Sequence, residues 1–252
     1  MTAPACADPA LIGVGVGPGD PSLITIKAVA TLRAASVVLV PSTETSGDDA
    51  GRAEQIVLAA CPEVSDRLRR VPFSMAERTG VGPVRQRAWE ASARAAEDAF
   101  AAGAHTIAFA TVGDPSVYST FSYLAAHVRA AVPGVRVEVV PGITAMQALA
   151  AASLTPLVEG RESLTLVPAT AGLDAVDAAL AHSDTVVAYK GGRELAALLE
   201  VIARRGRHGV LGVNIGLVGE SITPLSEVDA ATAPYFSTVL VAPVRDAAGG
   251  RL

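Results

Sequence analysis

The residues best suited to chemistry lie in four short stretches, each of which follows an apolar run typical of a buried strand. The first stretch is LIGVGVGPGDP at 11–21, and the others are TVGDP at 111–115, VVPGITA at 139–145 and YKGG at 189–192. Spaced glycines let the backbone turn sharply and let a ligand or a second segment approach closely. Because the carboxyl ends of parallel strands share one edge of an open α/β sheet, four such corners suit a ligand site there.

Each corner offers a chemical group, and each also has a purely structural interpretation. Asp114 can accept hydrogen bonds from a ligand hydroxyl or ammonium group, although an Asp-Pro pair is also a common turn. Thr144 offers a hydroxyl group and backbone amides at a helix start, which a simple helix cap would also provide. Lys190 places a charge at a strand end, as an ordinary surface lysine would.

The first loop does not match the dinucleotide-binding fingerprint GxGxxG. Pro18 or Asp20 stands where the third glycine should be. A carboxylate there would also oppose a pyrophosphate, which needs amides and a helix N-terminus. The chain has no GxxxxGK[ST] segment, so a P-loop is excluded.

Strand and helix patterns alternate along nearly the whole chain, which is typical of layered α/β proteins. We expect a strand at 36–40 that Pro41 closes. We expect a helix at 22–34 with Ser22 as its cap, and a turn at 220–226.

The pattern predicts two α/β domains. Residues 1–155 would form the first, with a mostly parallel sheet carrying the glycine loop and the GDP and PGI corners. Residues 156–252 would form the second, with more strands per residue and therefore a mixed sheet. The charge-free run at 139–158 has membrane length, but its prolines and glycine predict a buried turn plus a helix instead.

The composition argues against several partners. Among 252 residues, aromatic side chains make up 4% and the net charge is -5, which disfavours a nucleic-acid surface. Cys6 and Cys61 lie far apart and the four histidines are scattered, so we expect neither a disulfide scaffold nor a metal site. The first ten residues lack a basic and apolar leader pattern, so we expect no signal peptide. With the run at 139–158 interpreted as a turn and a helix, we expect no membrane partner and a cytoplasmic protein.

Taken together and in this order, the four corners resemble the tetrapyrrole methylases that use S-adenosylmethionine. The resemblance rests on GVGPGD at 15–20, GDP at 113–115, PGITA at 141–145 and Tyr189-Lys190, and it extends over about 11–244. It implies two α/β domains with the cofactor folded into the cleft between them, and a homodimer. The segments GVGPGDPSLITIKA, TVGDPSVYSTFSYL and GESITP resemble most closely the branch that methylates carbon 20 of precorrin-2.

The resemblance also implies roles for individual residues. S-adenosylmethionine would be bound, and S-adenosylhomocysteine released, by residues of all four corners together with the second domain. Lys190 stands where relatives often have methionine, so its backbone would make the contact. The expected cofactor-binding residues are Pro18, Val112, Gly113, Asp114, Val117, Thr144, Ala145, Lys190, Gly216, Leu217 and Leu240.

The implied reaction is a displacement in which a ring carbon attacks the activated methyl group, so no metal is required. The ring carbon must then lose a proton, for which Asp20, Glu44 and Glu220 are candidates by position. The tetrapyrrole carries several carboxylates, which arginines bind in a two-pronged manner. The candidate substrate-binding arginines are Arg52, Arg85, Arg87 and Arg161.

Other functions remain open at this stage. The substrate could be cobalt-factor II, or methylation could take place at another ring position of a corrinoid precursor. A related branch of the fold methylates a modified histidine on a translation factor. An NAD-dependent oxidoreductase and a catalytically silent binding module are weaker alternatives, because GxGxxG is missing and all four corners are retained.

Overall fold

The computed structural model describes residues 8–43, 50–73, 82–229 and 231–245. The chain divides into two units, Met1–Thr144 and Ala145–Leu252, which we describe separately. The division falls earlier than the expected boundary between residues 155 and 156, because the helix that begins at Ala145 packs on a strand of the second unit. The boundary of independently folding domains stays a prediction.

The first unit is built on a five-stranded sheet in which every pair of neighbouring strands is parallel, with the order β3-β2-β4-β1-β5. The mostly parallel first sheet is therefore confirmed. Its elements are β1 (Ala10–Gly15), α1 (Ile26–Ala34), β2 (Val37–Thr43), α2 (Arg52–Ala60), β3 (Leu68–Phe73), α3 (Pro83–Ala101), β4 (Thr106–Thr111), α4 (Phe121–Ala131) and β5 (Arg136–Val140).

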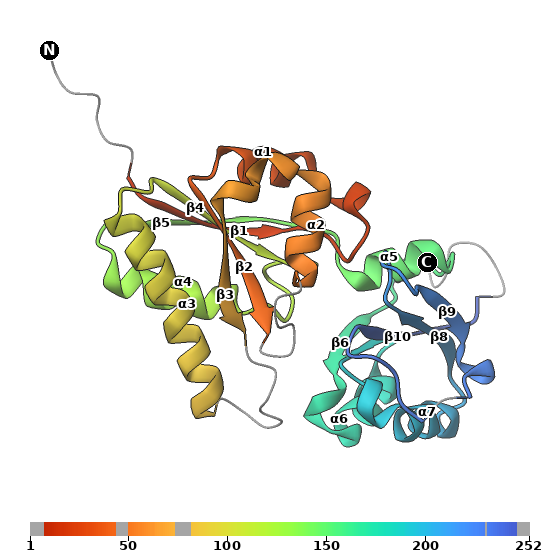
Figure 1. Ribbon diagram of the computed structural model, residues 1–252. Coiled ribbons are helices and arrows are strands. Elements are labelled where there is room, and N and C mark those ends of the chain that lie inside the picture. Colours follow the sequence, from red (N-terminus) through yellow and green to blue (C-terminus); the bar gives the residue numbers. More distant parts are fainter. Residues whose placement is uncertain (1–7, 44–49, 74–81, 230, 246–252) are drawn as a thin grey trace, which may run out of the picture. The chain divides into compact units, whose positions relative to one another are not determined.

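Alternate residues of β1 face opposite sides of this sheet, and a different pair of helices covers each side (Figure 1). Ile12 and Val14 pack with α1 and α2, whereas Leu11 packs with α3 and α4. All six residues of β1 are buried, as in parallel sheets covered on both faces. Strand β1 is therefore held firmly between two layers of helices, and the loop that follows it starts from a fixed point.

Two local expectations in this unit are wrong. The helix cap is Thr25 rather than Ser22, because the Thr25 side chain accepts a hydrogen bond from the amide of Ala28. Strand β2 continues through Pro41 to Thr43. Proline is tolerated there because β4 pairs only with residues 37–39 of β2, so Pro41 has a neighbouring strand on one side only.

The second unit has a mixed five-stranded sheet with the order β6-β7-β10-β8-β9, in which only β6 and β7 are parallel. The expected mixed sheet is confirmed. Its elements are α5 (Ala145–Ala152), β6 (Leu164–Pro168), α6 (Leu173–His182), β7 (Thr185–Tyr189), α7 (Leu195–Arg204), β8 (His208–Val213), β9 (Ser221–Pro224) and β10 (Ser237–Ala242).

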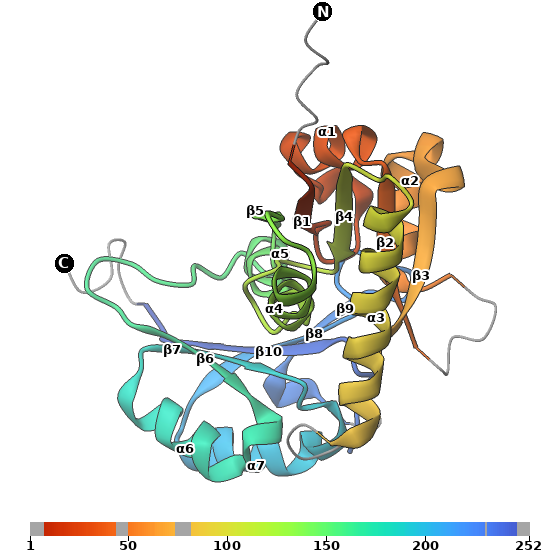
Figure 2. The same ribbon diagram turned by 90° about the vertical axis from the view of Figure 1, so that its left-hand side faces the viewer.

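Helices α6 and α7 lie together on one face of the second sheet (Figure 2), and Val176 and Leu198 belong to the core between these layers. Helix α5 packs on β10. Residues 221–224, expected within a turn, form strand β9, which pairs with β8. The sequence did not predict this strand, because an edge strand this short lacks a clear alternation of apolar and polar residues.

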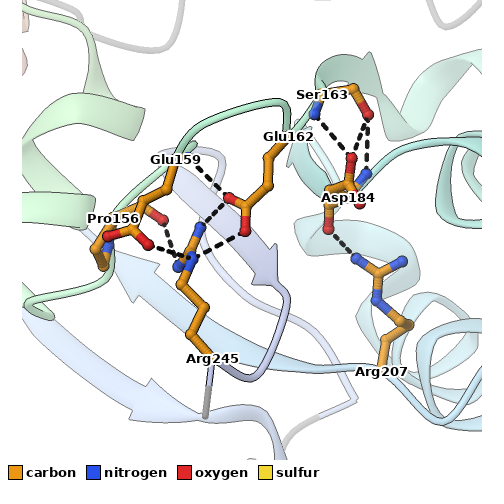
Figure 3. A network of polar contacts seen from close by, with 7 residues as sticks. All are labelled: Pro156, Glu159, Glu162, Ser163, Asp184, Arg207 and Arg245. Atoms are coloured by element: carbon orange, nitrogen blue, oxygen red, sulfur yellow. Dashed lines mark hydrogen bonds and ion pairs between the residues drawn. The ribbon is translucent and has the colours of Figure 1, made fainter. Parts of the chain in front are cut away.

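A polar network ties together one edge of the second sheet (Figure 3). The guanidinium of Arg245 donates to both carboxylate oxygens of Glu162 and, at 3.2 Å, to the carbonyl of Pro156. Arg207 donates to the carbonyl of Asp184, whose carboxylate accepts from the amide and hydroxyl of Ser163. This edge is the one at which β7 and β8 begin.

No helix within the part of the chain that the structure describes is long and apolar enough to cross a membrane. Most of the run at 139–158 lies in the turn after β5 and in α5, so the expected turn and helix are present. The expectation that the turn is buried is wrong, because only Thr144 among its residues is buried.

Candidate active site

Three of the four sequence corners meet at the carboxyl edge of the first sheet. The loop after β1 and the loop after β4 pair through the amide of Gly113, which donates to the carbonyl of Gly17 at 2.7 Å. The amide of Val16 donates to the carbonyl of Thr111 at 3.0 Å. The third corner, at 141–144, lies against both loops.

The glycines at this junction are required by the closeness of the backbones. A Cβ atom on Gly15 would lie 2.6 Å from both the carbonyl oxygen of Gly113 and the amide nitrogen of Gly142. A Cβ on Gly142 would lie 2.2 Å from the same carbonyl oxygen of Gly113. We call these three residues the glycine junction. Gly15 and Gly142 have no room for a side chain, whereas Gly113 adopts φ 72°, which favours glycine. The three backbones therefore approach closely and hold one another in place.

Asp114 binds the second corner to the third. One carboxylate oxygen accepts from the amide and hydroxyl of Ser116, the amide at 2.7 Å, and the other accepts from the amide of Gly142 at 2.8 Å. Burial by itself raises the pKa of Asp114, but the hydrogen bonds from Ser116 and Gly142 outweigh it and hold the pKa below its ordinary value. Asp114 is therefore a buried, ionised carboxylate that positions the junction.

The junction lies where the strand order reverses. Strands β1 and β4 are neighbours, yet the chain leaves β1 for β2 on one side and leaves β4 for β5 on the other. At such a switch point the loops diverge over opposite faces, which opens a crevice at the carboxyl ends of the strands. Ligands of open α/β sheets bind in this crevice.

The structure places five of the expected cofactor residues of the first unit beside the glycine junction. Pro18 and Thr144 are buried, and Val112 and Val117 are half-buried, on the loops that follow β1, β4 and β5. Gly113 belongs to the junction itself. These residues lie on loops that follow three different strands, so it is the tertiary structure that brings them together.

The expected residues of the second unit divide into two groups. Lys190 follows β7 in a left-handed conformation with φ 61°, and Gly216 and Leu217 follow β8. Tyr189 pairs with Thr238 near the start of β10. Its hydroxyl accepts a hydrogen bond from the amide of Met146, which brings the start of α5, with Ala145, to the same sheet edge. Their contact with a cofactor stays a prediction.

Leu240 differs from these residues. It lies in the middle of β10, is fully buried, and pairs with β7 on one side and β8 on the other. Its backbone is therefore occupied by the sheet, which does not favour the expected backbone contact with adenine.

The candidate bases make local contacts. The carboxylate of Asp20 accepts from the amide of Ser22 at 2.8 Å and caps a short 3-10 helix at 21–23. The carboxylate of Glu220 is exposed and accepts from the amide of Gly216. Glu44 lies outside the described residues. Asp20 and Glu220 thus stabilise their own loops, and their role as bases stays a prediction.

The four candidate arginines are not gathered at one place. Arg52 opens α2, whereas Arg85 and Arg87 lie in the first turns of α3 on the opposite face of the sheet, and Arg161 belongs to the second unit. Arg52 and Arg85 are half-buried, and burial lowers the pKa of Arg52. Arg87 and Arg161 are exposed. Within the described residues no group of three or more histidine, cysteine, aspartate or glutamate side chains could hold a metal ion.

A family model described as tetrapyrrole (corrin/porphyrin) methylases matches residues 10–229, which contain all four corners and extend into the second unit as far as the residues after β9. The chain belongs to this family. As a tetrapyrrole methylase it is 34% identical to a precorrin-2 C(20)-methyltransferase of Sinorhizobium over 92% of this chain and 94% of the relative. It is 31% identical to a cobalt-precorrin-2 C(20)-methyltransferase of Salmonella typhimurium over 92% of this chain and 95% of that one.

This tetrapyrrole methylase also shares its fold with solved structures. A uroporphyrin-III C-methyltransferase of Thermus thermophilus, solved with S-adenosylhomocysteine, matches with a TM-score of 0.63 and 22% identity, covering 92% of each chain. Membership of the family rules out the NAD-dependent oxidoreductase alternative.

Sequence reasoning missed three hydroxyls of this methylase. Those of Ser116 and Ser119 donate to Asp114 and Thr111 within the GDP corner, and that of Tyr189 accepts from the amide of Met146 at the start of α5. Ser116 and Ser119 follow the GDP motif within five residues, and Tyr189 was quoted only as a strand end. A turn brings Ser116 to the Asp114 carboxylate, so the Asp-Pro-Ser sequence could have predicted this hydrogen bond.

Proposed function

We propose that this protein transfers a methyl group from S-adenosylmethionine to carbon 20 of precorrin-2, giving precorrin-3A in cobalamin biosynthesis. One observation carries the proposal. The glycine junction lies at the switch point of an all-parallel sheet, in a chain whose similarity to enzymes named for this reaction extends over nearly its whole length.

The residues at the junction fit such a cofactor. S-adenosylmethionine supplies a methyl group already activated on a sulfonium, and it carries an ammonium group as well. A buried carboxylate that hydrogen bonds keep ionised, as in Asp114, favours cationic groups nearby. The half-buried side chains of Val112 and Val117 offer apolar surface, and Pro18 fixes the loop after β1.

The protein contributes position more than reactive groups. Backbones locked at the glycine junction cannot move relative to one another, so they can hold a donor and an acceptor in line without further ordering. Thr144, Ala145, Lys190, Gly216 and Leu217 remain further proposed cofactor contacts, whereas Leu240 is left out because the sheet occupies its backbone. Arg52, Arg85, Arg87 and Arg161 are proposed to bind ring carboxylates, and Asp20 and Glu220 remain the proposed bases. We propose that no metal takes part.

The first test is isothermal titration with S-adenosylhomocysteine of the wild type and of Asp114→Ala. The variant loses the carboxylate that holds Gly142, so we expect micromolar binding to the wild type and at least tenfold weaker binding to the variant. The second test is transfer of a labelled methyl group to precorrin-2. A wild type that neither binds S-adenosylhomocysteine nor methylates precorrin-2, with the ring present in both assays, would refute the proposal.

The alternative substrate is the cobalt-containing ring, which the name of the Salmonella relative supports. Turnover of precorrin-2 and of cobalt-precorrin-2 under one set of conditions would distinguish them. A higher kcat/KM for the cobalt form would replace the proposed substrate while leaving the reaction and its position on the ring unchanged.

We also propose a homodimer in the cytoplasm. The prediction is a particle of twice the chain mass of 25.5 kDa in sedimentation equilibrium. A concentration-independent mass of one chain would contradict the dimer, and recovery of the protein outside the cytoplasmic fraction of its own cells would contradict the location.

A further inference from the structure

The hydroxyl of Tyr189 connects two of the four corners within the second unit. It accepts a hydrogen bond at 3.1 Å from the amide of Met146, although the two residues lie 43 positions apart in the chain. Met146 lies in the first turn of α5, directly after the corner at 141–145, and Tyr189 ends β7, directly before the turn at 190–192. One side-chain contact therefore sets the spacing between a helix start and a strand end.

The backbone of Tyr189 is held on both sides. In the sheet it lies between Pro168 of β6 and Thr238 of β10. The turn that follows is closely packed, because the carbonyl of Gly192 accepts from the amide of Ala233 at 2.7 Å. A Cβ atom on Gly192 would lie 2.3 Å from the carbonyl oxygen of Ala233. The phenol ring therefore extends from a fixed point of the sheet.

The body of α5 is held by packing, but its first turn needs another support. Leu149 is fully buried and lies over β8 so closely that a Cβ atom on Gly212 would be 2.7 Å from its side chain. The first amides of a helix, in contrast, have no partner within the helix. The Tyr189 hydroxyl is the acceptor for the Met146 amide, so it holds the start of α5 one turn ahead of Leu149.

The residues beside this contact are among the proposed cofactor contacts. Ala145 precedes Met146, and Lys190 follows Tyr189. Lys190 adopts φ 61°, a left-handed conformation that a non-glycine residue keeps only where its surroundings fix it. A backbone contact of the kind proposed for Lys190 requires one stable backbone conformation, so the elements on both sides must be held in place.

We propose that Tyr189 is a positioning residue for S-adenosylmethionine. Its hydroxyl holds the first turn of α5 beside the end of β7, so that Ala145 and Lys190 meet the cofactor at a fixed spacing. Tyr189 acts through these residues and not by touching the cofactor itself. The inference rests on the proposed function, because this spacing matters only if the two residues bind S-adenosylmethionine.

The central test titrates S-adenosylhomocysteine into the wild type and Tyr189→Phe, well below the melting temperature of both. The substitution removes one neutral hydrogen bond and keeps the ring, so we expect the dissociation constant to rise about three- to tenfold. The KM for S-adenosylmethionine should rise in parallel, whereas kcat and the KM for the tetrapyrrole should stay within about twofold. A general loosening of the fold would not single out one of two substrates.

Two matched variants separate positioning from stability. Ile202→Val removes one methylene group from the core of the second unit, near the end of α7, where Ile202 is 2% exposed. Its melting temperature should fall about as much as that of Tyr189→Phe, with unchanged affinity for S-adenosylhomocysteine. Tyr123→Phe removes a tyrosine hydroxyl in the first unit, where Tyr123 stacks on Trp89, and should also leave the affinity unchanged. Equal weakening of binding by Ile202→Val and Tyr189→Phe would overturn the inference.

A second measurement tests the hydrogen bond itself. The chain has 3 methionines, so isotope-labelled methionine gives a simple spectrum in which Met146→Leu assigns the Met146 amide. In the wild type this amide should exchange slowly with deuterated solvent. Tyr189→Phe should speed its exchange by about threefold or more, because the acceptor is gone.

The two measurements together decide the inference. Faster exchange of the Met146 amide with weaker binding of S-adenosylhomocysteine would support it. Unchanged exchange, or faster exchange with unchanged binding, would overturn this inference alone. A wild type that neither binds S-adenosylhomocysteine nor methylates precorrin-2, with the ring present in both assays, would overturn it together with the proposed function.

Discussion

At the scale of single residues, Asp114 shows how a sequence signal can be right about place and incomplete about role. The GDP motif marked it as a polar group facing a ligand. In the structure three of its hydrogen bonds go to Ser116 and Gly142, so the carboxylate holds the loops together. An ionised group with internal partners provides both order and negative charge at one point.

We predict that Asp114→Asn lowers the free energy of unfolding by about 1–3 kcal/mol at neutral pH, because an amide NH₂ would face the Gly142 amide. Ser116→Ala, which removes only the hydroxyl contact, should cost less. The pKa of Asp114 is lower in the folded state, so its contribution exists above the unfolded value near 3.8 and is lost as pH falls through the folded value. Urea unfolding from pH 7 to pH 3 checks this, and a gap between variant and wild type that does not shrink in acid would contradict it.

The glycine junction makes a second residue-level prediction. Gly142→Ala places a methyl group 2.2 Å from the carbonyl oxygen of Gly113, so the backbones must move apart. We expect a stability loss of about 1–3 kcal/mol and loss of S-adenosylhomocysteine binding.

Gly134→Ala serves as the control in calorimetric titration and urea unfolding. Gly134 has φ 75° with no atom within 4 Å of the added Cβ, so its alanine variant introduces backbone strain without a clash. Equal loss of ligand binding in both variants would show that the close approach at Gly142 is not what matters.

At the scale of elements, the contact between β1 and α4 explains why the glycine pattern begins inside the strand. A Cβ on Gly13 would lie 2.6 Å from the ring of Phe121, which is 3% exposed and opens α4. The ring therefore occupies the space that a side chain on β1 would fill. This packing fixes where α4 begins, and with it the loop that carries Asp114.

We predict that Gly13→Ala and Phe121→Ala are strongly coupled. Phe121→Ala leaves a cavity and should cost about 3–5 kcal/mol, and Gly13→Ala costs through overpacking. The double variant should be more stable than the sum of the two by at least about 1 kcal/mol, because the methyl group enters the space that the ring vacates. Urea unfolding of the wild type, the two single variants and the double variant completes the cycle. If the two stability losses simply add, the Phe121 ring does not occupy the space beside Gly13.

At the scale of the whole molecule, each unit has its own hydrophobic core. In the second unit an ion pair also holds the segment that follows the last strand, β10. Arg245 follows β10 and binds Glu162, which precedes β6, so the two ends of this unit are joined. The two side chains are 13% and 4% exposed, unlike Arg205 and Asp177 at 40% and 36%. A shielded pair of this kind leaves a buried charge behind when one partner is removed.

We predict that Arg245→Met lowers the melting temperature clearly, whereas Arg205→Met changes it little. The hydrogen bond from Arg245 holds the pKa of Glu162 below its ordinary value. The stabilisation is therefore present above the unfolded pKa near 4.5 and is lost as pH falls through the folded value. Calorimetry at pH 7 and pH 4 measures both effects, and equal melting temperatures for the two variants at pH 7 would contradict the prediction.

The sequence by itself determined the α/β class, the parallel and mixed sheets, the family and the place of the first three corners. It could do so because strand and helix periodicity and turn glycines are local properties. Tertiary structure alone decided that Asp114 binds Gly142, that Gly13 makes room for Phe121, and that Pro41 lies inside a strand. These facts depend on distances between segments far apart in the chain, which no local pattern records. For the same reason the sequence does not assign roles to the candidate arginines and bases. A charged residue gives the same local pattern whether its side chain binds a ligand or a group of its own loop.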